Sequence, residues 1–167
     1  MKHLILILGI ALIGFGACKK DKPLVVGKTF ADYTIQDIKA QEGNFNSNPI
    51  TFNAPNTNFK VGSILFFKTN MGNYGKVEIQ NVGVKPDYKL TANVLVYDPN
   101  GTKVVEKVLN DIPSQLSYGY DFDDPLLPEV SQSNPNKTDF VWGESNSILA
   151  MFFVSGDQLA KGFLFKL

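Results

Sequence analysis

Apolar and polar side chains alternate along much of the chain after residue 61, which is typical of strands with one buried face. The clearest alternation runs through residues 74–82, where Val77 and Ile79 lie on one face and Lys76 lies on the other, polar face. Residues 147–154 are almost entirely apolar, as expected of a central strand. The other strands are predicted at residues 61–69, 90–96, 104–109, 115–122 and 161–167.

Turn residues separate these strands. Asp98-Pro99-Asn100-Gly101 predicts a type I turn, because proline presets φ at the second position and glycine suits the last. Residues 37–43 predict one helical turn, and residues 123–137 predict a long polar loop. Short strands at regular spacing, joined by hairpin turns, indicate an all-β chain folded as a single antiparallel β-sandwich, Ig-like or jelly-roll-like. A closed soluble β-barrel is the alternative.

The amino-acid composition excludes several kinds of catalytic, metal-binding and nucleic-acid-binding site. His3 and Cys18 are the only histidine and cysteine, and all 16 basic residues are lysines. A chain beginning at Cys18 therefore lacks the base of a Ser-His-Asp or Cys-His arrangement and the usual zinc ligands. It also lacks the arginine fork that reads phosphate and guanine. Its 15 lysines and 16 acidic residues give a net charge of −1 (15 − 16), so nucleic acid is not an expected partner.

The N-terminus has the features of a targeting segment. Met1-Lys2-His3 is a short basic start, residues 4–15 are apolar, and Gly16-Ala17 places small residues before Cys18. The apolar run is too short to span a bilayer comfortably. We therefore expect a signal peptide at residues 1–17, a tether that begins with Cys18 at residues 18–28 and a β-sandwich domain at residues 29–167.

The segment ending in Gly16-Ala17-Cys18 resembles the lipobox of secreted bacterial lipoproteins. The Cys18-Lys19-Lys20-Asp21 start is similar to that of surface lipoproteins of the Bacteroidetes type. This resemblance implies acylation of Cys18 and attachment to the membrane through that lipid. Because Lys19 follows the cysteine, it also implies sorting to the outer membrane, at the cell surface or on the periplasmic face.

Acidic residues gather after the strand expected at residues 115–122. Asp121 and Asp123 share one face of a strand end, and Asp124 follows them. Carboxylate oxygens at this spacing suit a hard cation, so Asp121, Asp123 and Asp124 are a candidate Ca²⁺ site. The alternative is a solvated strand end that runs into a turn.

Four aromatic residues flank the polar loop at residues 123–137. Planar rings among Asn and Asp side chains suit sugar binding, because ring faces contact C–H groups and polar groups bind hydroxyls. The alternative is that these rings fill the sandwich core. The candidate ligand-binding residues are Tyr118, Tyr120, Phe140 and Trp142.

Three functions remain open. The leading hypothesis is a lipid-anchored envelope lipoprotein with a non-catalytic role, binding a glycan or a partner outer-membrane protein. The second is a carboxylate-based polysaccharide hydrolase that pairs Asp121 or Asp123 with Asp139 or Glu144. The third is an assembly lipoprotein that recruits a partner by pairing with an exposed edge strand.

Overall fold

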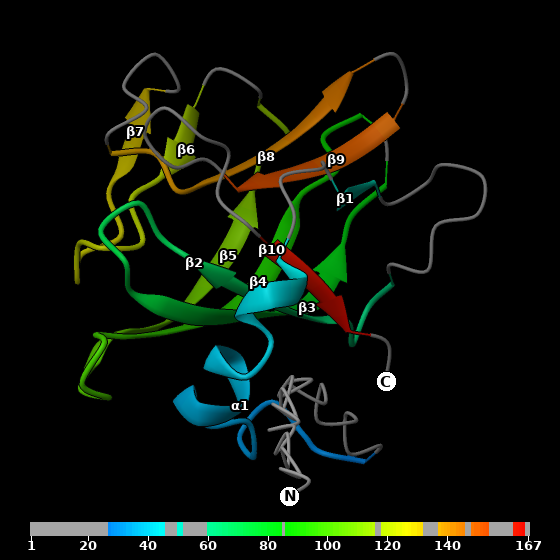
Figure 1. Ribbon diagram of the computed structural model, residues 1–167. Helices are drawn as coiled ribbons and strands as arrows, with labels where there is room; N and C mark the ends of the chain where they lie inside the picture. The colour runs from blue at the N-terminus through cyan, green and yellow to red at the C-terminus, as the bar shows by residue number, and fades with distance from the viewer. Residues whose placement is uncertain are drawn as a thin grey trace, which may run out of the picture.

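The computed structural model describes residues 27–45, 50–51, 60–84, 86–115, 118–131, 137–145, 148–153 and 162–165. The predicted signal peptide (residues 1–17) and Cys18 lie outside these residues. One short α-helix, one 3₁₀ turn and ten strands are described (Figure 1). In chain order they are α1 (Ile35–Lys39), η1 (Glu42–Asn44), β1 (Ile50–Thr51), β2 (Ile64–Lys68), β3 (Tyr74–Val82), β4 (Leu90–Tyr97), β5 (Lys103–Ile112), β6 (Tyr118–Tyr120), β7 (Glu129–Ser131), β8 (Phe140–Ser145), β9 (Ile148–Phe153) and β10 (Gly162–Phe165).

The strands form two antiparallel sheets. Sheet A has the order β10-β2-β3-β4-β5, and sheet B has the order β1-β9-β8-β6-β7. Figure 1 shows sheet B above sheet A, with α1 below sheet A. This arrangement confirms the predicted all-β sandwich. The described strands do not close into a barrel, because each sheet keeps two edge strands.

The main core lies between the two sheets. Leu65, Phe67 and Val77 of sheet A pack with Phe140 and Trp142 of β8, and all five are buried. Phe122, which follows β6, joins the layers: its ring lies 5.1 Å from Phe67 and 5.3 Å from Phe140, centroid to centroid. Aromatic contacts at these separations add to the free energy gained by burying apolar area.

A third layer covers the outer face of sheet A. Residues 27–45, here called the N-terminal strap, bury Tyr33, Ile38 and Phe45 against Ile64, Phe66 and Tyr74 of sheet A. Helix α1 begins with a capping box, in which Thr34 Oγ1 accepts from the amide of Asp37 and Asp37 Oδ2 accepts from the amide of Thr34. The strap therefore gives sheet A a second buried face.

Lys76 corrects the sequence interpretation of β3. The alternation placed it on a polar face, but it is fully buried beneath the strap. Its Nζ donates to the carbonyl oxygens of Phe30 and Tyr33 and lies 4.6 Å from the centroid of the Phe30 ring. Burial lowers the pKa of Lys76 to about 8, because water no longer solvates the ammonium.

Most predicted strands are confirmed, and the differences are local. β3 and β4 match their predicted ranges closely, and the hairpin at residues 98–102 forms with Asp98 Oδ1 accepting from the amides of Asn100 and Thr102. The strand predicted at residues 115–122 is shorter, because only Tyr118–Tyr120 pairs. The loop predicted at residues 123–137 is wrong at β7, which pairs with β6.

Replacing Ile38 tests whether the strap belongs to the folded domain. We expect Ile38→Ala to lower the free energy of unfolding by about 2–4 kcal/mol, because Ile38 is fully buried and its truncation leaves a cavity. Urea unfolding followed by tryptophan fluorescence measures this change. Leu126→Ala is the control: its side chain is 77% exposed, so we expect a change below about 0.5 kcal/mol. Equal stability of Ile38→Ala and the parent would show that the strap does not support the fold.

Candidate functional site

Three carboxylates meet at one end of the sandwich. Oxygens of Asp121, Asp123 and Asp139 lie within 4.8 Å of one another. The pairing of β6 with β8 brings these carboxylates together, because Asp121 and Asp123 follow β6 and Asp139 directly precedes β8. Asp139 is fully buried, and the other two are half-buried. We call these three residues the acid cluster.

The acid cluster joins the two sheets. Asp139 accepts from the amides of Asn70 (3.1 Å) and Phe122 (2.8 Å). Asp123 accepts from Thr69 Oγ1 (2.5 Å), from Asn73 Nδ2 (2.8 Å) and from the amide of Met71 (3.3 Å). Residues 69–73 form the hairpin between β2 and β3 of sheet A, whereas the carboxylates flank strands of sheet B. The acid cluster thus holds this hairpin against sheet B.

Burial and mutual repulsion change the protonation of the acid cluster. Burial, followed by the neighbouring charge of Asp123, raises the pKa of Asp139 to about 7. Burial also raises the pKa of Asp123, although its three hydrogen bonds oppose this change. The raised pKa of Asp139 favours a bound proton on this carboxyl below about pH 7, and carboxylate oxygens are also suitable ligands for Ca²⁺.

The candidate Ca²⁺ site in the structure differs by one residue from the site predicted from the sequence. Asp124 does not belong to the group of three; its Oδ1 accepts from the amide of Leu126 at 2.8 Å, within a turn. Asp139 takes its place, although it lies 15 residues further along the chain. Period-two spacing indicated Asp121 and Asp123, whereas only the pairing of β6 with β8 brings Asp139 to them.

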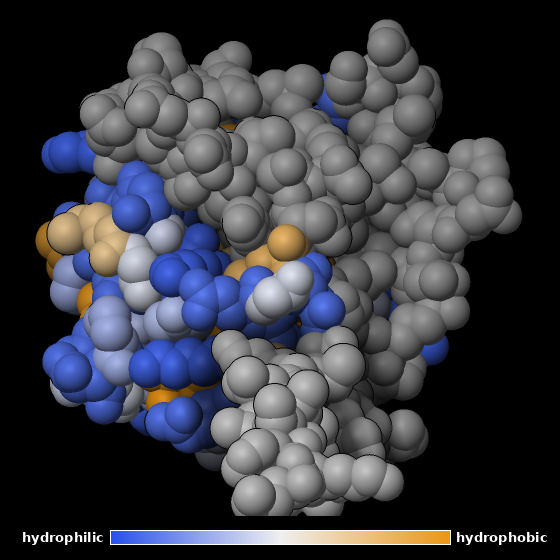
Figure 2. Space-filling view, viewed as in Figure 1, coloured by the Kyte–Doolittle hydropathy of each residue, from blue (hydrophilic) through white to orange (hydrophobic). Residues whose placement is uncertain are grey.

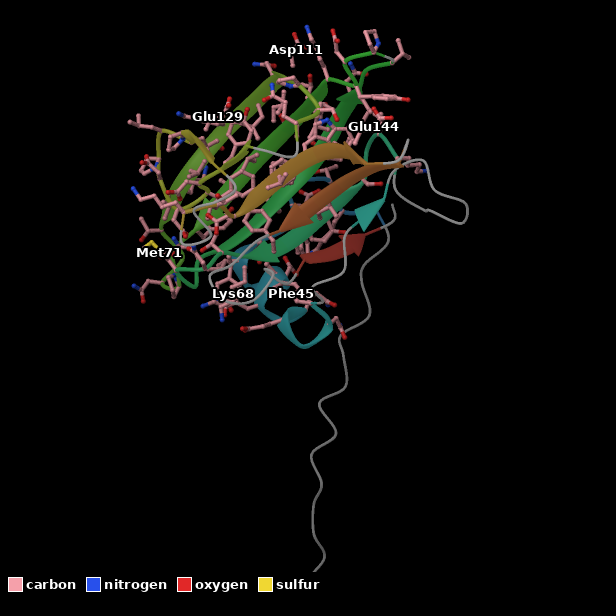
Figure 3. The ribbon with its side chains drawn as sticks, turned by 90° about the horizontal axis from the view of Figure 1, so that it is seen from above. Phe45, Lys68, Met71, Asp111, Glu129 and Glu144 are labelled. Carbon is pink, nitrogen blue, oxygen red and sulfur yellow. The ribbon has the colours of Figure 1, made fainter. Side chains whose placement is uncertain are left out.

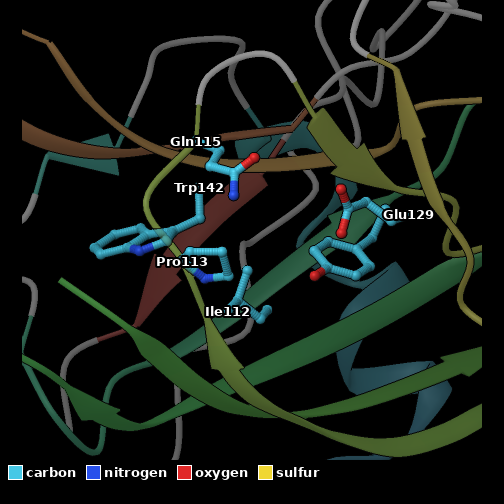
Figure 4. A pocket seen from close by; sticks show the side chains of 6 residues that line it. Ile112, Pro113, Gln115, Glu129 and Trp142 are labelled. Atoms are coloured by element: carbon cyan, nitrogen blue, oxygen red, sulfur yellow. The ribbon is translucent and has the colours of Figure 1, made fainter. Parts of the chain in front are cut away.

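The aromatic candidates are mostly core residues. Phe140 and Trp142 are 0% and 1% exposed, so their ring faces pack against protein. Tyr120 is half-buried and packs against the same core, and the side chain of Tyr118 lies outside the described part of the structure. The cavity beside Trp142 measures about 10 Å³, which is room for one water at most. Figure 4 shows Trp142 on one side of this cavity, next to Pro113, and Glu129 on the other.

The pairs considered for polysaccharide hydrolysis do not face each other across a cleft. Asp139 lies beside Asp121 and Asp123 within one hydrogen-bonded cluster. Glu144 of β8 lies five residues beyond Asp139, or about 16 Å at the rise of a strand, so it is also far from Asp121 and Asp123, which adjoin Asp139. A glycosidase needs two carboxyl groups roughly 5–9.5 Å apart with substrate between them.

A polar pocket of about 410 Å³ opens at the other end of the sandwich. Figure 3 shows Met71, in the hairpin held by the acid cluster, at one end and Asp111 and Glu144 at the opposite end. Two loops and one strand form the pocket: the β3–β4 connection, the β5–β6 connection and β8. The lining residues are Pro86, Asp87 and Lys89, then Pro113, Ser114 and Gln115, and finally Glu144. These residues are dispersed in the sequence and carry no motif, so sequence reasoning missed all of them except Glu144, which it considered only as a carboxylate for hydrolysis.

Fold and site define an antiparallel two-sheet β-sandwich with an acid cluster at one end and a polar pocket at the other. Searches among protein-family models, curated proteins and solved structures found no match to this chain. Within the described residues, no helix is long and apolar enough to cross a membrane.

The raised pKa of Asp139 predicts a specific dependence of the stability on pH. Between about pH 4 and pH 7 the folded chain keeps a proton that the unfolded chain releases, so the free energy of unfolding falls as the pH rises. At about 1.4 kcal/mol per pKa unit, this fall amounts to about 4 kcal/mol at most. We expect Asp139→Asn to be less stable than the parent at pH 4 and to lose this disadvantage by pH 8. Urea unfolding at several pH values measures the difference, and Asp124→Asn serves as the control. A constant difference between parent and Asp139→Asn would contradict the buried proton.

The calcium hypothesis makes a separate prediction. A cation shared by the acid cluster should raise the midpoint of thermal unfolding at pH 8 and raise it less at pH 5, where protons compete for the oxygens. A chelator should reverse the effect, and Asp123→Asn should abolish it. Asp124→Asn should preserve it, because Asp124 lies outside the acid cluster. If added calcium did not change the midpoint of thermal unfolding at pH 8, the calcium hypothesis would be refuted.

Proposed function

We propose that this protein is a lipid-anchored lipoprotein of the bacterial cell envelope, whose β-sandwich has a non-catalytic binding role. The observation that carries the proposal is the N-terminal segment, in which an apolar run ends at Gly16-Ala17-Cys18. Acyl chains on Cys18 would hold the mature chain in the outer membrane, since several chains together give stable attachment. The bound partner would be a glycan or another envelope protein.

The position of the N-terminal strap supports this arrangement. Nine residue steps separate Cys18 from Gly27, the first residue described, and a fully extended chain of that length spans about 30 Å. The strap then packs on the outer face of sheet A, where Lys76 donates to its carbonyl groups. A lipid on Cys18 would thus keep the domain within about 30 Å of the bilayer.

Recruitment by edge-strand pairing has less support at β5. This strand forms one edge of sheet A, and it carries two register irregularities against β4. Lys107 lies opposite Val94, and its Nζ donates a hydrogen bond to the carbonyl oxygen of Leu126 (2.9 Å). An exposed lysine at a core-facing position and register irregularities along the edge are features that oppose pairing with another chain.

The face seen in Figure 2 also favours a polar partner. Its described part is mostly hydrophilic, and apolar colour occurs in small separate patches. Exposed large apolar side chains, such as Met71 and Leu126, are normal when they occur singly. A partner with hydroxyl, amide or charged groups matches such a surface better than an apolar one does.

Metabolic labelling with a fatty-acid analogue tests the anchor. We expect the parent chain to take up label and to fractionate with outer membranes, and Cys18→Ala to do neither, because Cys18 is the only thiol in the chain. Lys20→Ala is the control and should keep the label.

Protease treatment of intact cells then separates the two faces of the membrane. Cleavage of the parent domain would place it at the cell surface, and protection until the outer membrane is opened would place it in the periplasm. Label that persists in Cys18→Ala would refute the lipid anchor.

A further inference from the structure

The polar pocket has side chains that are free to bind. Within the described part of the structure, the side chains of Asp87, Lys89, Gln115 and Glu144 make no hydrogen bond or ion pair with another described residue. Carboxylates that accept and an ammonium and an amide that donate thus surround one space. Its volume, about 410 Å³, lies within the range of about 300–1,000 Å³ common for ligand sites.

Backbone hydrogen bonds fix the walls of this pocket before any ligand enters. The amide of Ser114 donates to the carbonyl oxygen of Asp87 (3.2 Å), which joins the two loops. Trp142 joins both loops to β8: its Nε1 donates to the carbonyl oxygen of Tyr88 (2.8 Å), and its own carbonyl oxygen accepts from the amide of Gln115 (3.0 Å). A preformed site of this kind reduces the entropy that binding must overcome.

Ser114 contributes a second, independent observation. Its hydroxyl oxygen is buried and has no hydrogen-bond partner among the described residues. A buried polar atom without a partner costs about 1–3 kcal/mol. A hydroxyl both donates and accepts, so rotation about χ1 toward the pocket would let a ligand hydroxyl satisfy it.

The lining chemistry selects among ligands. Two carboxylates and one ammonium give the pocket a formal charge of −1 with both signs present, so neither an anion nor a cation is strongly favoured. A ligand with many hydroxyl groups uses every lining group, because each hydroxyl donates to a carboxylate and accepts from Lys89 or Gln115. The rings of Pro86 and Pro113 offer apolar surfaces for C–H groups.

We propose that the polar pocket binds a neutral carbohydrate, a unit of one or two sugar residues within a larger glycan. The proposal rests on the binding role proposed above and gives it a ligand class and a location. It moves the sugar contact from the buried aromatic residues to the rim formed by Asp87, Lys89, Gln115 and Glu144. Trp142 then acts as a positioning residue that holds the two loops.

A larger pocket, about 510 Å³, fits this ligand less well. It lies where the strap enters the domain, and two of its charged lining side chains, Lys28 and Glu78, already have partners. Lys28 pairs with Asp37 at 2.8 Å, and Glu78 accepts from Gln80 and Asn93. A ligand there would have to replace existing hydrogen bonds.

Titration of the full-length protein with neutral trisaccharides tests the proposal. The probes are maltotriose, cellotriose and chitotriose, with spermidine as a cationic comparison, and calorimetry or chemical-shift changes report binding. We expect at least one trisaccharide to bind, and Gln115→Ala to weaken it about tenfold, because one hydrogen bond of about 1.4 kcal/mol is lost. Gln80→Ala is the matched control, since Gln80 is an exposed glutamine outside the pocket, and it should leave the affinity unchanged.

Each other outcome overturns the proposal. If none of the three sugars bound, the proposed carbohydrate ligand would be refuted. If Gln115→Ala bound a sugar as tightly as the parent does, the proposed location in the polar pocket would be refuted. Binding of spermidine alone, lost in Glu144→Gln, would make the pocket a cation site. Thermal unfolding of each variant shows that the fold is kept. Acyl labelling is independent of these titrations, so a labelled chain that binds no sugar would refute this inference and leave the lipid anchor standing.

Discussion

The burial of Lys76 is the constraint on which the arrangement of layers depends. A lysine in the middle of β3 would normally face water, yet here it lies between sheet A and the N-terminal strap. Its ammonium is tolerated because two carbonyl oxygens of the strap accept from it, and the low pKa of about 8 records the remaining cost of burial. The strap therefore supplies apolar cover for Ile64 and Phe66 and solvation for Lys76 together. Loss of the strap would expose Ile64 and Phe66 to water and would also leave the ammonium of Lys76 without its carbonyl partners.

The two ends of the sandwich use similar polar side chains in opposite ways. At the acid cluster, Asp123 and Asp139 receive five hydrogen bonds from described residues, and these bonds fasten a hairpin of sheet A to sheet B. At the polar pocket, Asp87 and Glu144 receive none from described residues. Fully partnered polar groups stabilise a fold, whereas unpartnered ones around a concave surface are available to a ligand. This contrast is the physical reason why we propose a ligand at the polar pocket and a structural role for the hydrogen bonds of the acid cluster.

Local sequence patterns predicted the elements well and the contacts between them less well. Alternation gave the bounds of β3, and Asp98-Pro99-Asn100-Gly101 gave the hairpin that joins β4 to β5, because both depend on neighbouring residues alone. The burial of Lys76 could not be read from β3, since it depends on the strap some 40 residues earlier. The exchange of Asp124 for Asp139 has the same cause, a pairing of β6 with β8 that spacing along the chain does not encode. The pocket combines three distant segments and left no local signal.

Trp142 is buried, yet it helps to shape the polar pocket. Its ring lies in the core, so it offers no face to a sugar, yet its Nε1 and its carbonyl oxygen hold the two loops of the polar pocket. Truncating it would leave a large core cavity and release both loops, and the loss of about 3–5 kcal/mol expected for such a change would threaten the fold itself. Lost binding in that variant would therefore say nothing about ligand contact. Informative substitutions lie at the rim, where Gln115 and Lys89 are exposed and support no other described side chain.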